Sequence, residues 1–386
     1  MTRRLAALAA LLSLLVPAVA ACGDGIGTAG TLVVLGPWLD DPGARDDESD
    51  VFRQVLAEYA TANDLEITYQ GTRAIGQALR AKVKDGTLPD IAILPTVGEL
   101  ATFATEELAQ PVTPVVRSAL RAPPGQTIVD HRALWRGERA YAVAIKTDVK
   151  SLIISSGSTG TRWCLGLSAA ASPGWPGTDW IEDLLLQAMD VPSYESMASG
   201  KMEWSRTRPA WVTFAGYLGD RRHALLTSPV EAAGELAAGR CDRMHQSSFY
   251  APPGATMVPS GQRMEVSGDF AARFTTNPAA EDLLRHLASG TAWVAAGQGR
   301  VFPLDPDPAA YQPPRREVAQ RLRDAPNRCL DASDAMPPPM ASAFQKAILE
   351  FVADPDRLDH LSGLLARLDK IQLQIGGERL TVRCSA

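Results

Sequence analysis

The sequence lacks a basic tract, closely spaced metal ligands and, beyond its first 20 residues, any apolar run long enough to cross a membrane. Its 386 residues carry a net charge of −6, which becomes −8 when the two arginines of the expected leader are removed. An acidic chain without clustered lysine and arginine is unsuited to nucleic acid, because phosphate binding needs concentrated positive charge. The five histidines are scattered without the spacing of a metal site, so we expect no metal and no other cofactor.

Recognisable catalytic motifs are also missing. Gly166–Ala170 is similar to a nucleophile elbow but lacks its final glycine, and no histidine and aspartate follow it in a convincing context. The acidic pairs at 40–41 and 46–47 fall in a segment that we expect to be a solvated loop. The sequence therefore predicts a protein that is not an enzyme.

The first 22 residues have the pattern of a lipoprotein leader. A basic start is followed by an apolar run of about a dozen residues, shorter than the roughly 20 that span a bilayer. Val19-Ala20-Ala21 then leads into Cys22, whose thiol is the natural acceptor for a diacylglyceryl group. We expect a signal peptide at 1–21, a lipidated, flexible tether at 22–30, and a chain anchored by lipid to the extracytoplasmic face of a cell membrane. The alternative is an ordinary leader followed by a chance cysteine.

Four more cysteines follow, an even number in an oxidising compartment, which favours two disulfides. Three connectivities are possible, and we favour Cys164 with Cys241 and Cys329 with Cys384. Each pair would close a loop worth about 4 kcal/mol in the chain-entropy model. The alternative is four buried free thiols.

The N-terminal part of the mature chain alternates apolar strands with helical periodicity. We expect strands near 32–35, 65–69 and 90–95, with helices at 51–59 and 75–83 between them. This β-α-β-α-β order predicts an α/β fold with a parallel sheet, in which ligands gather at the carboxyl ends of the strands. A mature chain of about 365 residues exceeds what one hydrophobic core usually organises, so two lobes are expected.

The later sequence predicts further strands and several helices. Two strands are expected at 141–145 and 151–154, and they could carry the chain from one lobe to the other. The proline-rich segment 303–314 is expected to be irregular. Apolar stripes predict helices at 278–289, 340–351 and 358–368.

Five motifs in one order are the most specific internal feature. The strongest is GWPGTDWIED at 174–183, which follows RWCLG at 162–166, and the others are YQGTR at 69–73, LPDIAILP at 88–95, HQSSF at 245–249 and DASDAMP at 331–337. Together, behind the lipobox, they resemble the extracellular solute-binding lipoproteins of carbohydrate ABC transporters, most of all the α-glucoside-binding branch. The likeness is collinear from about residue 31 to the C-terminus.

The resemblance implies a two-lobed periplasmic-binding-protein-like fold of type II, with the ligand cleft between lobes that close by hinge bending. We expect the first lobe to comprise 31–145 and about 265–310, and the second to comprise about 146–264 and 311–386. The implied function is delivery of a sugar, a di- or oligosaccharide, to an ABC importer. The implied partners are the sugar, the permease subunits and the membrane that holds the lipid anchor.

The resemblance also implies the ligand-binding residues. Trp38 follows the first strand, Trp175 and Asp179 lie in an expected long loop, and the remaining positions are Thr72, Arg73, Pro95, Thr96 and Gln246. Arg73 could donate two parallel hydrogen bonds to adjacent hydroxyls or to a carboxylate.

Each of these positions also has a structural alternative. Trp38 and Trp175 could pack within a lobe, and Arg73 could be an ion-paired surface residue. Asp179 could instead cap a helix beginning near Trp180, itself expected in the core. His245, in the same motif as Gln246, is expected to be structural.

The chain departs from the family pattern after Leu152. There the family usually has an aromatic pair and then a helix before its Trp-Cys, whereas this sequence has Ile153-Ile154 and a short segment before Trp163-Cys164. About one helix and one usual stacking aromatic are missing. This supports an alternative function, a non-transport sensor or envelope interaction protein on the same scaffold with altered or lost sugar binding.

Overall fold

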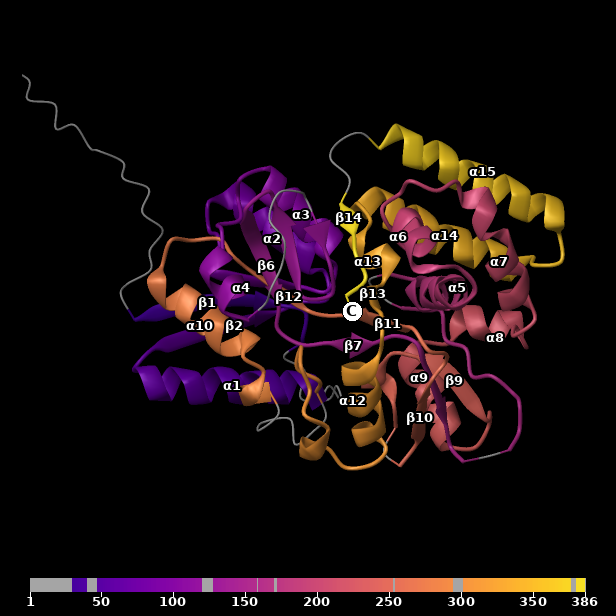
Figure 1. Cartoon of the computed structure of the whole chain (residues 1–386), viewed down its shortest axis with the longest axis horizontal. Helices are drawn as coiled ribbons and strands as arrows, with labels where there is room; N and C mark the ends of the chain where they lie inside the picture. Colours follow the sequence, from indigo (N-terminus) through magenta and orange to yellow (C-terminus); the bar gives the residue numbers. More distant parts are fainter. Residues whose placement is uncertain are drawn as a thin grey trace, which may run out of the picture.

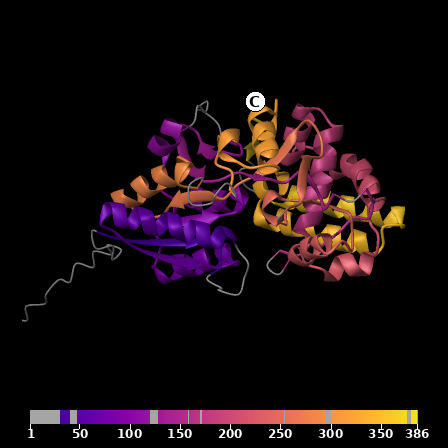
Figure 2. The ribbon, with the colours of Figure 1, turned by 90° about the horizontal axis from the view of Figure 1, so that it is seen from below.

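The computed structural model describes residues 30–39, 47–119, 128–157, 159–169, 172–252, 254–293, 301–375 and 380–385. The expected signal peptide, Cys22 and most of the tether lie outside these residues. Two halves lie side by side, one built mainly from the N-terminal part of the chain and the other from its middle and C-terminal parts (Figures 1 and 2).

An eight-stranded sheet in the order β14-β4-β5-β6-β12-β3-β1-β2 forms the centre of the first half. Strand β1 (Thr31–Gly36) pairs in parallel with β2 (Glu66–Gly71) and β3 (Ile91–Leu94), and α1 (Asp47–Asn63) and α2 (Ile75–Asp85) connect them. The predicted β-α-β-α-β unit is therefore confirmed. The other strands of this sheet are β4 (Ile128–Val129), β5 (Ala133–Arg136), β6 (Arg139–Ala144), β12 (Phe270–Arg273) and β14 (Thr381–Val382).

Both faces of the sheet are covered, as the continuous apolar runs require. In β3, Ile91 and Ile93 belong to the core under α1, whereas Ala92 and Leu94 belong to the core on the opposite face, with α2. Three more helices complete the covering, α4 and α10 on the α1 face and α3 on the α2 face. They are α3 (Val97–Thr105), α4 (Thr113–Ala119) and α10 (Pro278–Ala288).

A small sheet lies between the halves and carries the chain across (Figure 1). Its central strand β11 (Met264–Ser267) pairs in antiparallel fashion with β7 (Asp148–Val149) and in parallel with β13 (Arg328–Leu330). A second small sheet, within the other half, has the order β10-β8-β9. Its strands are β8 (Leu152–Ser155), β9 (Arg243–Gln246) and β10 (Thr256–Pro259).

Helices dominate the second half, and α5 packs against α14 without an intervening side chain at Gly177. A Cβ at this position would lie 2.4 Å from Ile348 Cγ2, so only glycine fits. The predicted C-terminal helices are confirmed as α14 and α15. The helices are α5 (Trp175–Ala188), α6 (Val191–Ala198), α7 (Arg208–Ala215), α8 (Arg221–Leu226), α9 (Pro229–Ala237), α12 (Arg315–Asp324), α13 (Ala332–Ala335), α14 (Pro338–Ala353) and α15 (Leu358–Gln374), with 3₁₀ turns η1 (Trp204–Thr207), η2 (Ser248–Tyr250) and η3 (Pro308–Ala310).

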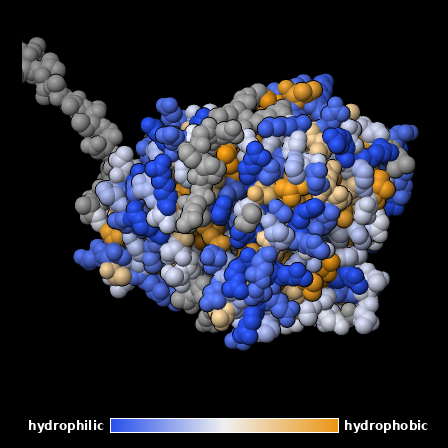
Figure 3. Space-filling view, viewed as in Figure 1, coloured by the Kyte–Doolittle hydropathy of each residue, from blue (hydrophilic) through white to orange (hydrophobic). Residues whose placement is uncertain are grey.

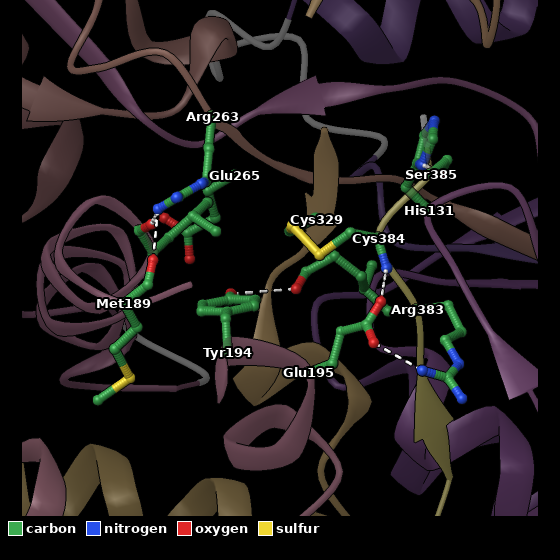
Figure 4. The surroundings of a disulfide bond; sticks show 12 residues. His131, Met189, Tyr194, Glu195, Arg263, Glu265, Cys329, Arg383, Cys384 and Ser385 are labelled. Carbon is green, nitrogen blue, oxygen red and sulfur yellow. Dashed lines mark hydrogen bonds and ion pairs between the residues drawn. A yellow bond between two sulfur atoms is a disulfide. The ribbon is translucent and has the colours of Figure 1, made fainter. Parts of the chain in front are cut away.

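Two disulfides join the expected partners, Cys164 with Cys241 and Cys329 with Cys384, with Cα–Cα distances of 5.5 and 4.2 Å. Cys329 belongs to β13 and Cys384 follows β14, so the second disulfide fixes the C-terminal segment to the sheet between the halves (Figure 4). The same segment pairs with β4 at the edge of the large sheet.

The two halves also meet directly between α3 and α13. A Cβ on Gly98 would lie 2.1 Å from the carbonyl oxygen of Met336, so the backbones approach where glycine leaves room. One apolar core runs through this contact from Leu94 and Leu100 to Met340 and Phe344.

Hydrophilic side chains cover most of the face in Figure 3, and no helix in the described part of the chain is long and apolar enough to cross a membrane.

Candidate functional site

Two buried lysines, Lys146 and Lys150, flank β7 where the chain leaves the large sheet. Their side chains are 1% and 8% exposed. A buried ammonium requires nearby carboxylates, because an uncompensated charge is costly away from water. The structure supplies each lysine with a separate set.

Lys146 is held tightly by three carboxylates. Its Nζ lies 2.6 Å from Asp148 Oδ2, 2.9 Å from Asp269 Oδ2 and 3.3 Å from Glu48 Oε2. Burial alone would lower the pKa of Lys146, but these carboxylates raise it well above its usual value. Since Glu48 belongs to α1, this cluster ties the first half to the crossing strand.

Lys150 has looser carboxylate partners from the second half. Its Nζ lies 3.3 Å from Asp331 Oδ2, 3.4 Å from Asp179 Oδ2 and 3.9 Å from Asp334 Oδ2. It also lies 4.6 Å from the centre of the Trp175 ring, within the range of a cation–π contact. Burial alone would lower the pKa of Lys150, but Asp179, Asp334, Asp331 and Glu265 raise it well above its usual value.

The carboxylates around Lys150 share its charge unequally. Burial, Asp331 and Asp334 raise the pKa of Asp179 well above its usual value despite the nearby ammonium. Asp331 is also buried, yet Lys150 and hydrogen bonds to its carboxylate lower its pKa. Among these carboxylates, Asp331 is therefore the one that lies nearest to Lys150 and has a lowered pKa.

Three aromatic residues run from one lysine to the other, and we call them the aromatic row: Trp175, Tyr250 and Phe249. The Trp175 and Tyr250 rings stack at 6.2 Å and 23°, and the Tyr250 and Phe249 centres are 4.6 Å apart. Phe249 is 36% exposed and its ring lies 5.5 Å from Lys146 Nζ. Aromatic rings stack on the apolar C–H faces of sugars while charged groups bind the hydroxyls, so this arrangement suits a saccharide.

The structure corrects the expected context of Trp175 and Asp179. The sequence predicted a long loop and a helix that begins near Trp180, but α5 begins at Trp175. Gly174 precedes it with a φ of 97°, and Pro176 occupies the first turn, where its missing N–H costs nothing. Asp179 therefore lies within the helix and caps nothing. The predicted core position of Trp180 is confirmed by its 5% exposure.

Trp38 packs in the core under α1. It is 3% exposed, and its ring centre lies 4.6 Å from that of Phe52 and 5.9 Å from that of Trp293. Its indole Nε1 donates to Glu48 Oε2 at 3.2 Å, and Glu48 is also a partner of Lys146. Trp38 thus reaches the Lys146 cluster through Glu48.

The other first-half positions follow strands β2 and β3. Thr72 is half-buried and donates its backbone N–H to the Gly36 carbonyl, while Arg73 is exposed. Pro95 is exposed, and Thr96 is half-buried immediately before α3. Because α3 contacts α13 at Gly98, the end of β3 lies beside the helix that carries Asp334.

Gln246 and His245 end strand β9, just before the aromatic row. Gln246 is buried and its Oε1 accepts a hydrogen bond from the Ser247 backbone. His245 Nε2 lies 2.8 Å from Asp183 Oδ2, and its ring packs 4.6 Å from Trp180, as expected for a structural histidine.

Sequence reasoning missed Lys146, Lys150, Phe249 and Tyr250 as candidate site residues. Two lysines between the apolar runs at 142–145 and 152–154 were an available signal, because lysine is rarely buried without a carboxylate partner. The partners themselves come from distant elements.

A separate surface cavity of about 410 Å³ shares no residue with the aromatic row and is lined by His223, Leu226, Thr227, Glu231, Gly234, Glu235 and Arg240.

Two curated proteins are similar to the chain over most of its length. The alpha-glucosides-binding periplasmic protein AglE of Rhizobium meliloti is 24% identical over 417 aligned positions, which cover 89% of this chain and 88% of that protein. The osmoprotective compounds-binding protein GgtB of Synechocystis is 24% identical over 376, covering 80% and 87%. No family model matches the sequence.

Among solved structures, the bacterial solute receptor AcbH, described as preferring β-D-galactopyranose exclusively, superposes with a TM-score of 0.72. The two are 14% identical, and the match covers 90% of this chain and 99% of AcbH. The architecture, with a large mixed sheet and strands crossing to a helical half, agrees with this likeness. The chain therefore has the fold of the type II solute-binding proteins, and over most of its length it is similar to sugar-binding receptors of that group.

Proposed function

We propose that this chain is the solute receptor of an ABC importer and that it binds a di- or oligosaccharide. The aromatic row, which joins two buried lysine clusters at the crossing strand β7, carries the proposal. A sugar ring would stack on Trp175 or Phe249, and its hydroxyls would bind the neighbouring charged groups. The near full-length similarity to an α-glucoside-binding protein supports a sugar as ligand, and binding without catalysis is the function.

The first half would supply the opposite wall of the site. Thr72 and Arg73 follow β2, and Pro95 and Thr96 follow β3, at the carboxyl ends of parallel strands, where ligands of α/β sheets gather. Arg73 would donate hydrogen bonds to the sugar when the halves close. Permease subunits would then receive the loaded, closed form.

A lipid on Cys22 would hold the receptor at the extracytoplasmic face of the membrane. The proposal rests on the Val19-Ala20-Ala21-Cys22 box and on the tether that follows it. Metabolic labelling with a fatty-acid analogue tests it, with label expected in the wild type and absent from Cys22→Ser. Equal label in both proteins would exclude the anchor.

One observation favours a second candidate, a sensor that keeps the scaffold but not the sugar. The described residues between β8 and α5 (159–169 and 172–174, with 156 and 157) contain no helix. The family pattern has a helix in this segment and an aromatic pair just after Leu152. The described residues of the segment form no helix, and Ile153-Ile154 occupy the place of the stacking aromatic.

A sugar panel distinguishes the two candidates. A ligand that binds only the folded state stabilises it by about 2.7 kcal/mol at a hundredfold excess over Kd, so at least one mono-, di- or oligosaccharide should raise the Tm. With that sugar, Arg73→Ala should weaken binding by about 5- to 150-fold, whereas Arg117→Ala, an exposed arginine on α4, should not. No Tm shift with any sugar at millimolar concentration would favour the sensor.

A further inference from the structure

One carboxylate of the Lys150 cluster, Asp331, also belongs to a group of three buried carboxylates whose other members, Glu182 and Glu265, have no part in the proposed function. Glu182, Glu265 and Asp331 come from α5, β11 and the residue after β13, and each is at most 1% exposed. One carboxylate oxygen from each lies within 4.8 Å of the other two. Three acidic groups this close and this buried require compensating positive charge.

Glu182 and Asp331 are each fixed through one oxygen, while the second oxygen of Glu182 accepts no hydrogen bond and that of Asp331 faces the Lys150 ammonium. Glu182 Oε2 accepts from the backbone N–H groups of Ala332 and Ser333 at 2.6 and 3.1 Å, and Oε1 has no donor. Asp331 Oδ1 accepts from the Ser333 hydroxyl and the Asp334 N–H, and its Oδ2 has no hydrogen bond. Hydrogen bonds to the outer oxygens orient carboxylate ligands in metal sites in the same way.

Glu265 is the independent evidence for a ligand. It is fully buried, and neither of its carboxylate oxygens has a hydrogen-bond partner among the described residues. Its backbone is fixed, because its N–H donates to Ser151 Oγ and its carbonyl accepts from the Lys150 N–H. Arg263, two residues away, donates to the carbonyls of Leu186 and Met189 rather than to Glu265 (Figure 4).

The nearby cations do not balance these charges. Lys150 Nζ lies 3.3 Å from Asp331 Oδ2 but is shared with Asp179 and Asp334, and His245 is taken by Asp183. Burial and the neighbouring carboxylates raise the pKa of both Glu182 and Glu265 well above the usual value.

We propose that Glu182, Glu265 and Asp331 bind a hard divalent cation, Ca²⁺ above all, which links α5, β11 and the end of β13. Ca²⁺ takes carboxylate oxygens at 2.3–2.6 Å, so oxygens bound to one ion can stand no more than about 5 Å apart, and the three oxygens here lie within 4.8 Å of one another. An all-oxygen set disfavours Zn²⁺, which prefers nitrogen and sulfur. The proposal departs from the expectation of no metal in the sequence analysis, which considered the histidines and not buried carboxylates.

The site would fix the sheet between the halves to the second half. Strands β11 and β13 both belong to that sheet, and α5 carries Trp175 at its start. A bound ion would hold the aromatic row in a constant position relative to the crossing strands. Its role would be structural, and it would exist whether or not the chain binds sugar.

Native mass spectrometry and thermal melting of the purified protein after EDTA treatment test this proposal. With 1 mM Ca²⁺ we expect one bound ion and a Tm increase of about 5 °C if the Kd is near 10 μM, with a smaller effect of Mg²⁺ and none of Zn²⁺. Glu265→Gln keeps the shape of the side chain and should abolish both effects. Glu317→Gln, an exposed glutamate on α12, should retain both.

The opposite results would overturn the proposal. No bound Ca²⁺ and an unchanged Tm in the wild type would show that protons neutralise the cluster. Binding that persists in Glu265→Gln would place the ion elsewhere. If that variant fails to fold, the mass and melting temperature of the wild type decide the question by themselves.

Discussion

Lys146 and Lys150 lie four residues apart at the two ends of β7, yet their surroundings differ. Lys146 has two carboxylates within 3 Å, from β7 and from the residue before β12, and a third from α1. Lys150 has no carboxylate closer than 3.3 Å and a tryptophan ring at 4.6 Å. The tight cluster suits a structural connection, whereas the loose cluster leaves an aromatic face and shared charge available to a ligand.

The largest expected difference concerns stability. Lys146→Met leaves Asp148 and Asp269 buried without their cation, which should cost about 3–5 kcal/mol of the free energy of unfolding. Lys150→Met should cost clearly less, because its carboxylate partners lie 3.3 Å or more from Nζ and bind it less tightly. Denaturant unfolding of both variants measures the difference. Equal losses would remove the distinction between the clusters.

The two disulfides differ in their relation to the lysine clusters. Only Cys329–Cys384 has a cysteine close in sequence to a partner of one of the lysines, Asp331. Replacing either cysteine pair by serine should cost about 2–4 kcal/mol, since the bridges span comparable separations of 77 and 55 residues. Cys329 lies in β13, two residues before Asp331. Loss of Cys329–Cys384 should therefore be non-additive with Lys150→Met but additive with Lys146→Met in double-mutant cycles. Additivity in both cycles would contradict this link.

Sugar affinity tests which end of the aromatic row the ligand contacts. Trp175→Ala, at the Lys150 end, should weaken binding by about 1–3 kcal/mol, or roughly 5- to 150-fold, with little change in the Tm of the ligand-free protein. Phe249→Ala, at the Lys146 end, should weaken it less. Calorimetric titration and melting curves of both variants decide this. A large loss of Tm with unchanged affinity would make Trp175 a packing residue.

A further expected effect concerns pH, and it should arise from neither lysine. The pKa values of both lysines are raised, so both remain charged across the physiological range. Burial instead lowers the pKa of His131 to about 3, against about 6.5 in the unfolded chain. The unfolded state therefore binds a proton that the folded state excludes, and stability should fall by about 1.4 kcal/mol per pH unit from about pH 6.5 towards 3.

Urea unfolding at several pH values measures this slope. His131→Gln should flatten it, whereas His223→Gln, at an exposed position, should not. An unchanged slope in His131→Gln would assign the acid sensitivity to the carboxylates.

Local patterns determined much of the fold. Residues 32–35 and 90–95 become strands of a parallel sheet because continuous apolar runs can be buried on both faces, and the helical stripes at 340–351 and 358–368 become α14 and α15. The cysteine count favoured two disulfides, and both connect the expected partners. Each of these inferences depends on neighbouring residues or on simple counting.

The start of α5 and the burial of Trp38 could not be read in the same way. Gly174 ends the loop with a positive φ, and Gly177 lets α5 lie against α14, so the helix begins five residues before Trp180. Trp38 follows the end of a strand, a position where a ligand-stacking residue is expected. Its ring nevertheless packs against Phe52 and Trp293 in the core. In both cases a partner distant in sequence decided the outcome.

The sequence by itself determined that two lysines would stand four residues apart with Asp148 between them, but only the tertiary structure buried them and gave them different partners. Glu48 arrives on α1 and Asp269 just before β12, whereas Asp179 arrives on α5 and Asp331 after β13. Carboxylates separated by so many residues leave no local motif. Their energetic weight depends on distances of a few ångströms and on exclusion of water, which exist only once the two halves have assembled around β7.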